Sequence, residues 1–132
     1  MTDRSSPPPD PYRFIEAHID SVPHLEALIL LWNSRPVGWT TEELVSRLYV
    51  PPEQVDSIVR DLARAELLRE TASSPYKYAY HSRTPDQDEM MHHVDAAYRQ
   101  DLVRISSAIH RKASSAVREF ARAFRLRKEQ DK

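Results

Sequence analysis

Apolar residues recur at helical intervals through the first third of the chain. A short set covers residues 12–19. A longer set over residues 22–35 has apolar side chains at i, i+3, i+4 and i+7, namely Leu25, Leu28, Ile29 and Trp32. Pro23 lies in the first turn of the longer segment, where a helix tolerates proline. We therefore expect a short helix over 12–19 and a central core helix over 22–35.

A second pair of helical segments follows Gly38. Trp39 is expected to begin a strand of one or two residues, and Thr40 with Glu43 forms a capping box that starts a short helix. A tight turn then leads into a longer helix with Pro52 at its first position. The inward face of this longer helix is predicted to carry Val55, Ile58, Val59, Leu62 and Ala63.

Two strands are expected next, over residues 67–71 and 76–80. In the second, Tyr76, Tyr78 and Tyr80 alternate with Lys77 and Ala79. This period of two is typical of a half-buried strand. The pattern up to residue 83 thus predicts a mainly α fold with a small β-hairpin.

The order of these elements resembles that of winged helix-turn-helix domains. The segment WTTEELVSRLYVPPEQVDSIVRDLARAELLRET, residues 39–71, is similar to the core of that superfamily. One departure is Glu66, which precedes the leucine pair at a position where the superfamily usually has glycine. The resemblance covers residues 20 to about 82 and implies a winged-helix fold, for which DNA binding is the usual function.

The C-terminal third has its own pattern, because no proline or glycine occurs between residues 86 and 128. Apolar positions recur there at intervals of 3, 4 and 4, an 11-residue repeat that keeps one stripe along a nearly straight helix. A helix of roughly 40 residues is about 60 Å long, more than one small domain can cover. We therefore expect a coiled-coil homodimer with a second copy covering the stripe. Its predicted interface is Met91, Val94, Tyr98, Leu102, Ile105, Ile109, Phe120 and Phe124.

A second resemblance concerns this helix. The ending FARAFRLRK, with IDSVPHLEALILL near the start, resembles a family of small bacterial winged-helix proteins of uncharacterised function. Members often carry proline where this chain has Ala113 and Ala116, which implies a joint near residues 111–116. We expect one helix with a kink near Ser114. The predicted organisation is a disordered Pro-rich tail (1–11), a winged-helix domain (12–83), a long C-terminal helix (84–128) and a disordered end (129–132).

Composition excludes several classes of chemistry. The chain has no cysteine, which excludes disulfides and thiolate zinc sites, and one glycine, too few for a phosphate-binding loop. Glu89 with His92 and His93 has metal-ligand spacing, yet the second ligand set of a di-metal bundle is missing. Ser106 and His110 lie one helical turn apart, but the sequence has no loop beside them that could form an oxyanion hole for a serine nucleophile. We expect no enzymatic activity, no cofactor and no metal site, and a cytoplasmic location because neither a signal peptide nor a membrane span occurs.

The net charge of −1 hides an asymmetry. Residues 1–85 hold nine basic and twelve acidic residues, whereas residues 102–128 hold eight basic residues and one acidic residue. Five arginines of that segment lie opposite the apolar stripe and are named the basic rail: Arg104, Arg111, Arg118, Arg122 and Arg125. Such a rail is either a solvated face or a surface for nucleic acid, anionic lipid or an acidic protein.

The resemblance to winged-helix domains implies a DNA-binding transcriptional regulator, which the apolar stripe predicts to be dimeric. Gln54 and Ser57 are expected near base edges, Arg60 near a guanine or a phosphate, and Lys77 near phosphate. Arg47 and Arg64 complete the predicted DNA-binding set. The alternative is a winged-helix adaptor whose basic C-terminal helix binds an acidic protein partner or a membrane surface.

Overall fold

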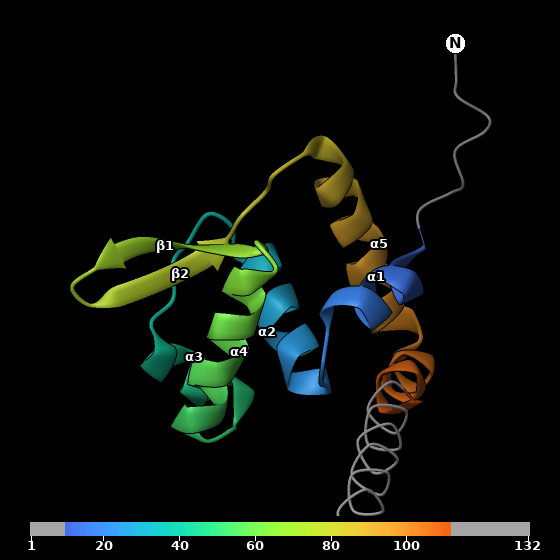
Figure 1. Cartoon of the computed structure of the whole chain (residues 1–132), viewed down its shortest axis with the longest axis horizontal. Coiled ribbons are helices and arrows are strands. Elements are labelled where there is room, and N and C mark those ends of the chain that lie inside the picture. Colours follow the sequence, from blue (N-terminus) through green and yellow to red (C-terminus); the bar gives the residue numbers. More distant parts are fainter. Residues whose placement is uncertain (1–9, 112–132) are drawn as a thin grey trace, which may run out of the picture.

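Within residues 10–111, which the computed structural model describes, the chain forms a mainly helical fold with one antiparallel β-hairpin (Figure 1). The elements are α1 (Pro11–His18), α2 (Val22–Asn33), α3 (Thr41–Leu48), α4 (Pro52–Arg64), β1 (Leu68–Ser73), β2 (Tyr76–Tyr80) and α5 (Pro85–Gln100). A further helix begins at residue 102 and continues to residue 111. The predicted class, mainly α with a small hairpin, is therefore confirmed.

Side-chain oxygens cap the first turns of α1, α2 and α3. The Tyr12 amide donates to Asp10 Oδ1 at 3.0 Å, so α1 begins inside the tail that was expected to be disordered. The capping box of α3 is confirmed, because the Glu43 amide donates to Thr40 Oγ1 at 3.1 Å and the Thr40 amide donates to Glu43 Oε1 at 3.0 Å. Residues 1–9 and the expected disordered end lie outside the described residues.

Trp39 adds a single bridge to the hairpin. Its amide donates to the Tyr78 carbonyl, and the Tyr78 amide donates to the Trp39 carbonyl, both at 2.8 Å. The chain approaches β1 and β2 closely just before this bridge, because a β-carbon at Gly38 would overlap the Thr71 hydroxyl. The short strand expected at Trp39 is thus confirmed as a one-residue bridge, and the close approach favours glycine at position 38, since a β-carbon there would displace the Thr71 hydroxyl.

Glu66 links α4 to β1 in the left-handed backbone region, with φ of 62°. For a residue with a β-carbon this conformation costs about 1–2 kcal/mol relative to the right-handed region. The resemblance noted in the sequence would have placed glycine at this position. The Glu66 carboxylate forms an ion pair with Arg83, and both side chains are more than half exposed, so the pair stabilises the corner little.

Helix α2 is the centre of the core. It contacts α3, α4 and β2, and its Leu25, Leu28 and Leu31 are fully buried. Helices α1 and α5 pack against each other beside it (Figure 1). Ile15 of α1 and Ile19, which directly follows this helix, are also fully buried and belong to the same apolar cluster.

The expectation of one helix from residue 84 onward is wrong. Helix α5 ends at Gln100, and Asp101, with φ of −146°, interrupts it before the next helix begins. The Arg104 amide donates to Asp101 Oδ1 at 3.4 Å, and the Ile105 amide donates to the Asp101 carbonyl at 3.1 Å. Asp101 therefore acts as the N-cap of a new helix, which needs neither proline nor glycine. Residue 111 is helical, and the rest of the joint expected near 111–116 lies outside the described residues.

For four residues the predicted dimer interface is wrong, because the same chain covers them. Met91, Val94 and Ile105 are 0% exposed and Ile109 is 2% exposed within a single copy. All four belong to the cluster that contains the core residues of α1 and α2. The interruption at Asp101 turns the second half of the stripe back toward α1. A second copy is therefore not needed to bury these residues.

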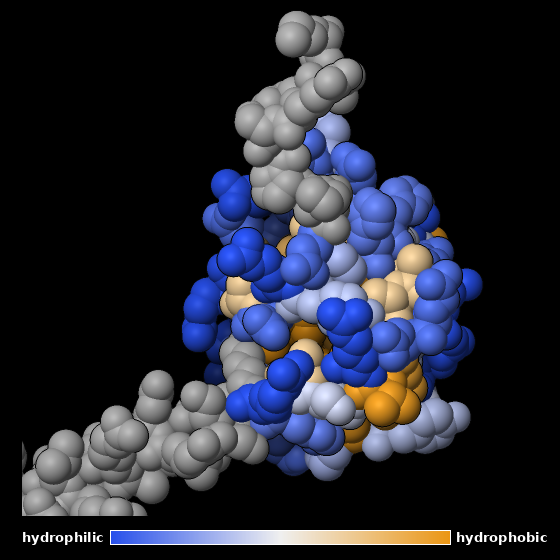
Figure 2. Space-filling model, turned by 90° about the vertical axis from the view of Figure 1, so that its right-hand side faces the viewer, coloured by the Kyte–Doolittle hydropathy of each residue, from blue (hydrophilic) through white to orange (hydrophobic). Residues whose placement is uncertain are grey.

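The other interface residues do not restore the dimer argument. Tyr98 is half-buried against this core, and burial together with the nearby Glu26 of α2 raises the pKa of its hydroxyl. Leu102 is 46% exposed beside the interruption. Phe120 and Phe124 lie outside the described residues. The face that carries α1 and α5 is largely hydrophilic, with only small apolar areas (Figure 2).

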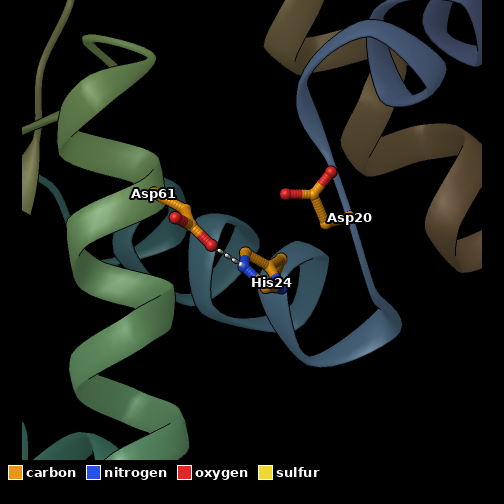
Figure 3. Close-up of side chains that lie close together, drawn as sticks. All are labelled: Asp20, His24 and Asp61. Atoms are coloured by element: carbon orange, nitrogen blue, oxygen red, sulfur yellow. Dashed lines mark hydrogen bonds and ion pairs between the residues drawn. The ribbon is translucent and has the colours of Figure 1, made fainter. Parts of the chain in front are cut away.

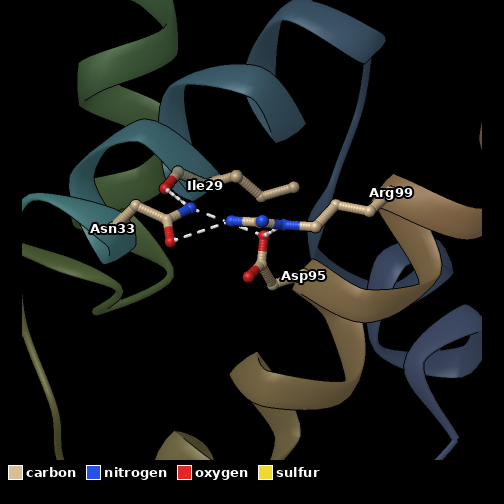
Figure 4. A network of polar contacts seen from close by, with 4 residues as sticks. All are labelled: Ile29, Asn33, Asp95 and Arg99. Carbon is tan, nitrogen blue, oxygen red and sulfur yellow. Dashed lines mark hydrogen bonds and ion pairs between the residues drawn. The ribbon is translucent and has the colours of Figure 1, made fainter.

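Polar contacts fix α5 against the end of α2 (Figure 4). Arg99 donates to Asp95 Oδ1 at 3.1 Å within α5 and to Asn33 Oδ1 at 3.3 Å across to α2. The Asn33 amide group donates to the Ile29 carbonyl at 3.0 Å and to Asp95 Oδ1 at 3.4 Å. These mostly exposed bonds link α5 to the last turn of α2.

Candidate nucleic-acid interface

Helix α4 presents one apolar and one polar face. Four inward residues, Val55, Ile58, Val59 and Leu62, are buried against the core and fix the rotation of the helix. Four residues of the predicted DNA-binding set are exposed on α4, namely Gln54, Ser57, Arg60 and Arg64. We call these four the α4 row. At about 100° per residue, Ser57, Arg60 and Arg64 lie opposite the buried residues and Gln54 lies on the flank of the helix. Two thirds of the predicted set are thus exposed on one helix.

The other two predicted residues lie on the elements beside α4. Arg47 is exposed in the last turn of α3, with its guanidinium 5.7 Å from the centre of the Trp39 ring. Lys77 is half-buried in β2, one residue before the tyrosine that pairs with Trp39. Both cations therefore flank the Trp39 bridge.

Acidic groups stand among these cations. Glu53 and Asp56 are exposed on α4 beside the α4 row. Burial raises the pKa of Tyr78 in β2, and the nearby charges of Glu70 and Asp56 raise it further. At the N-terminus of α3, hydrogen bonds from Thr40 lower the pKa of Glu43, and Lys77 lowers it less. The candidate interface is therefore of mixed charge.

The basic rail is only partly within the described residues. Arg104 is exposed, and its guanidinium lies 4.0 Å from the centre of the Tyr12 ring. Arg111 is also exposed. Arg118, Arg122 and Arg125 lie outside the described residues. The contact with Tyr12 gives Arg104 a structural role whether or not it meets a partner.

A polar cluster that the sequence analysis missed joins the chain before α2 to α4 (Figure 3). The His24 ring lies between Ser21 and Asp61, with Nδ1 2.6 Å from Ser21 Oγ and Nε2 2.9 Å from Asp61 Oδ2. Asp20 places a carboxylate oxygen nearby, so that one ligand atom from each of Asp20, His24 and Asp61 lies within 4.8 Å of the others. Asp20 and His24 have i, i+4 spacing, but only tertiary packing brings Asp61 to them.

The residues considered for metal binding or catalysis in the sequence lie elsewhere. His92 of α5 packs edge-on against Trp32, with ring centres 5.0 Å apart, while Glu89 and His93 are exposed. His110 is exposed and Ser106 is half-buried.

Comparison with known proteins finds no relative of the chain. No protein-family model, curated protein or solved structure matches the chain significantly. Among the described helices, none has the length and apolar character needed to cross a membrane. The geometry of α4, the hairpin and the polar cluster is therefore what indicates the function of the chain.

Proposed function

We propose that the chain is a winged-helix DNA-binding protein that acts as a transcriptional regulator and places α4 in the major groove. The succession α2, Trp39, α3, α4 and hairpin follows the order of winged helix-turn-helix domains. The major groove is about 12 Å wide and admits an α-helix. The observation that carries the proposal is the α4 row, a set of polar side chains exposed on one helix.

Each residue of the row has a chemical role in this proposal. Gln54 pairs with an adenine edge and Ser57 with a base of either kind, since these side chains both donate and accept hydrogen bonds. Arg60 reaches guanine O6 and N7 through its planar fork. Arg47, Arg64 and Lys77 contact phosphates on either side of the groove.

The charge of the domain sets the strength of binding. Residues 1–85 carry a net charge of −3, so general attraction to DNA is weak. Arg47, Arg64 and Lys77 would neutralise three phosphates. The logarithm of the association constant should then fall with the logarithm of salt concentration with a slope of about −3. We therefore expect binding that is detectable at low salt and depends on base contacts at moderate salt.

Electrophoretic shifts with genomic DNA fragments test the proposal. Arg60→Ala should weaken binding at least tenfold, because it removes the main base contact of α4. Arg111→Ala is the matched control, an exposed arginine on another helix, and should bind DNA as the unmodified chain does. The proposal fails if no fragment is retained even at low salt.

The second candidate is a protein-binding adaptor. It is favoured by the exposed Glu53 and Asp56 beside the α4 row and by the charge of +7 over residues 102–128. In that case the basic rail is the functional surface, and it meets an acidic protein or an anionic membrane. The same two variants separate the candidates, since Arg111→Ala and not Arg60→Ala would then weaken capture of the partner.

A further inference from the structure

We propose that Asp20, His24 and Asp61 form a binding site for a divalent transition-metal ion, with Zn²⁺ as the best match. The three residues come from the chain before α2, the first turn of α2 and the last part of α4. Their ligand atoms lie within 4.8 Å of one another (Figure 3). Around a tetrahedral Zn²⁺ with bonds of about 2.0–2.2 Å, ligand atoms lie about 3.4 Å apart. Binding of the ion therefore requires the Asp20 side chain to move toward His24 and Asp61.

The buried histidine is already oriented for this role. His24 is 8% exposed, and its Nδ1 is held 2.6 Å from Ser21 Oγ, so Nε2 points toward the carboxylates. Metal-binding histidines characteristically hold their second ring nitrogen in such a hydrogen bond. Without metal, Nε2–H donates to Asp61. With metal, the neutral ring carries its proton on Nδ1, which donates to Ser21, and Nε2 binds the ion.

The site is accessible, and its charge favours a cation. Asp61 is 31% exposed at its side chain, and Asp20 and Asp61 line an open hollow of about 250 Å³. The two carboxylates are therefore open to solvent through this hollow, which His24 does not line. His18 lies on the same hollow and offers a further nitrogen, whereas Arg64 lies there as a cation that opposes binding.

The ligand set selects the kind of ion. One imidazole nitrogen and two carboxylate oxygens, with an open fourth position, suit Zn²⁺. Ca²⁺ and Mg²⁺ prefer sites made only of oxygen and bind more ligands or keep several waters. A bound ion would link α4 both to α2 and to the chain before it. The His24–Asp61 hydrogen bond links α4 to α2 alone. The site itself does not depend on DNA binding.

Calorimetric titration of the full, tag-free chain with ZnCl₂ in a non-chelating buffer tests the proposal. We expect one site, a higher Tm with Zn²⁺, and no comparable effect of Mg²⁺. Asp20→Asn and Asp61→Asn should each weaken binding at least tenfold. Both substitutions keep the size of the side chain, and the amide oxygen introduced by Asp61→Asn can still accept the hydrogen bond from His24. Arg64→Ala should tighten binding.

Two controls separate this site from general binding to surface histidines. Glu16→Gln removes another exposed carboxylate from the neighbouring α1 and should leave Zn²⁺ affinity unchanged. The double variant His92→Ala/His93→Ala should also bind Zn²⁺ as the unmodified chain does. The proposal is overturned if the chain binds no Zn²⁺, if both Asp→Asn variants bind it normally, or if the histidine variant abolishes binding.

Discussion

The hydroxyl of Tyr12 donates a hydrogen bond of 3.3 Å to Asp101, 89 residues later in the chain. The same aspartate caps the following helix, and Arg104 from that helix places its guanidinium over the Tyr12 ring. The first helix thus holds the point at which the C-terminal region changes direction. This change of direction brings Ile105 and Ile109 into the core.

Replacement of Asp101 by alanine should lower the free energy of unfolding by about 1 kcal/mol, the usual cost of losing an N-cap. Loss of the bond from Tyr12 adds to this effect. Urea denaturation measures the change, and the adjacent exposed Gln100→Ala is the control. Equal stability of the two variants would show that Asp101 does not determine where the helix breaks.

Ile105→Asp should lower stability by about 3–5 kcal/mol, because it leaves an unpaired charge in the core. Ile105 is 0% exposed, whereas Val103, two residues earlier, is 79% exposed. Val103→Asp is therefore the matched control and should change stability by less than about 0.5 kcal/mol. Circular dichroism with sedimentation measures both variants. A folded Ile105→Asp monomer obtained from a dimeric parent would instead place this residue between two copies.

The sequence predicts most of the local structure but not how the C-terminal region packs. The capping box at Thr40 and the hairpin are local patterns, so they could be found from residue order alone. The apolar intervals continue unchanged across Asp101, and an aspartate without a neighbouring proline or glycine gives little warning of a break. Its contact with Tyr12, which is distant in sequence, forms only in the packed chain. For the same reason, His24 could not be matched with Asp61 before α2 and α4 were packed together.

Glu66→Gly should raise the free energy of unfolding by about 1 kcal/mol. Glycine adopts the left-handed conformation without steric cost, which outweighs the loss of an exposed ion pair with Arg83. Glu66→Gln is the control, because it removes the charge and keeps the β-carbon. Thermal unfolding should place the glycine variant above the parent and the glutamine variant close to it. A glycine variant no more stable than the glutamine variant would show that the corner is not strained.

Stability should fall at alkaline pH because of Tyr80. Burial, foremost, raises the pKa of its hydroxyl to about 12, and the bond that it donates to Asp88 at 3.1 Å acts in the same direction. In the unfolded chain the pKa is about 10, so between pH 10 and 12 the folded state holds a proton that the unfolded state has lost. This contribution is complete below pH 10 and is lost as the pH rises toward 12.

Urea denaturation between pH 8 and 12 measures this loss, with Tyr80→Phe as the comparison. The phenylalanine variant should be about 1 kcal/mol less stable at neutral pH, because Gln87, which donates to the Tyr80 hydroxyl at 2.8 Å, loses its acceptor. Since phenylalanine does not ionise, the gap between parent and variant should narrow above pH 10. Tyr78 and Tyr98 remain in both proteins, so their titration cancels in the comparison. Parallel curves up to pH 12 would mean that Tyr80 ionises equally in the folded and unfolded chains.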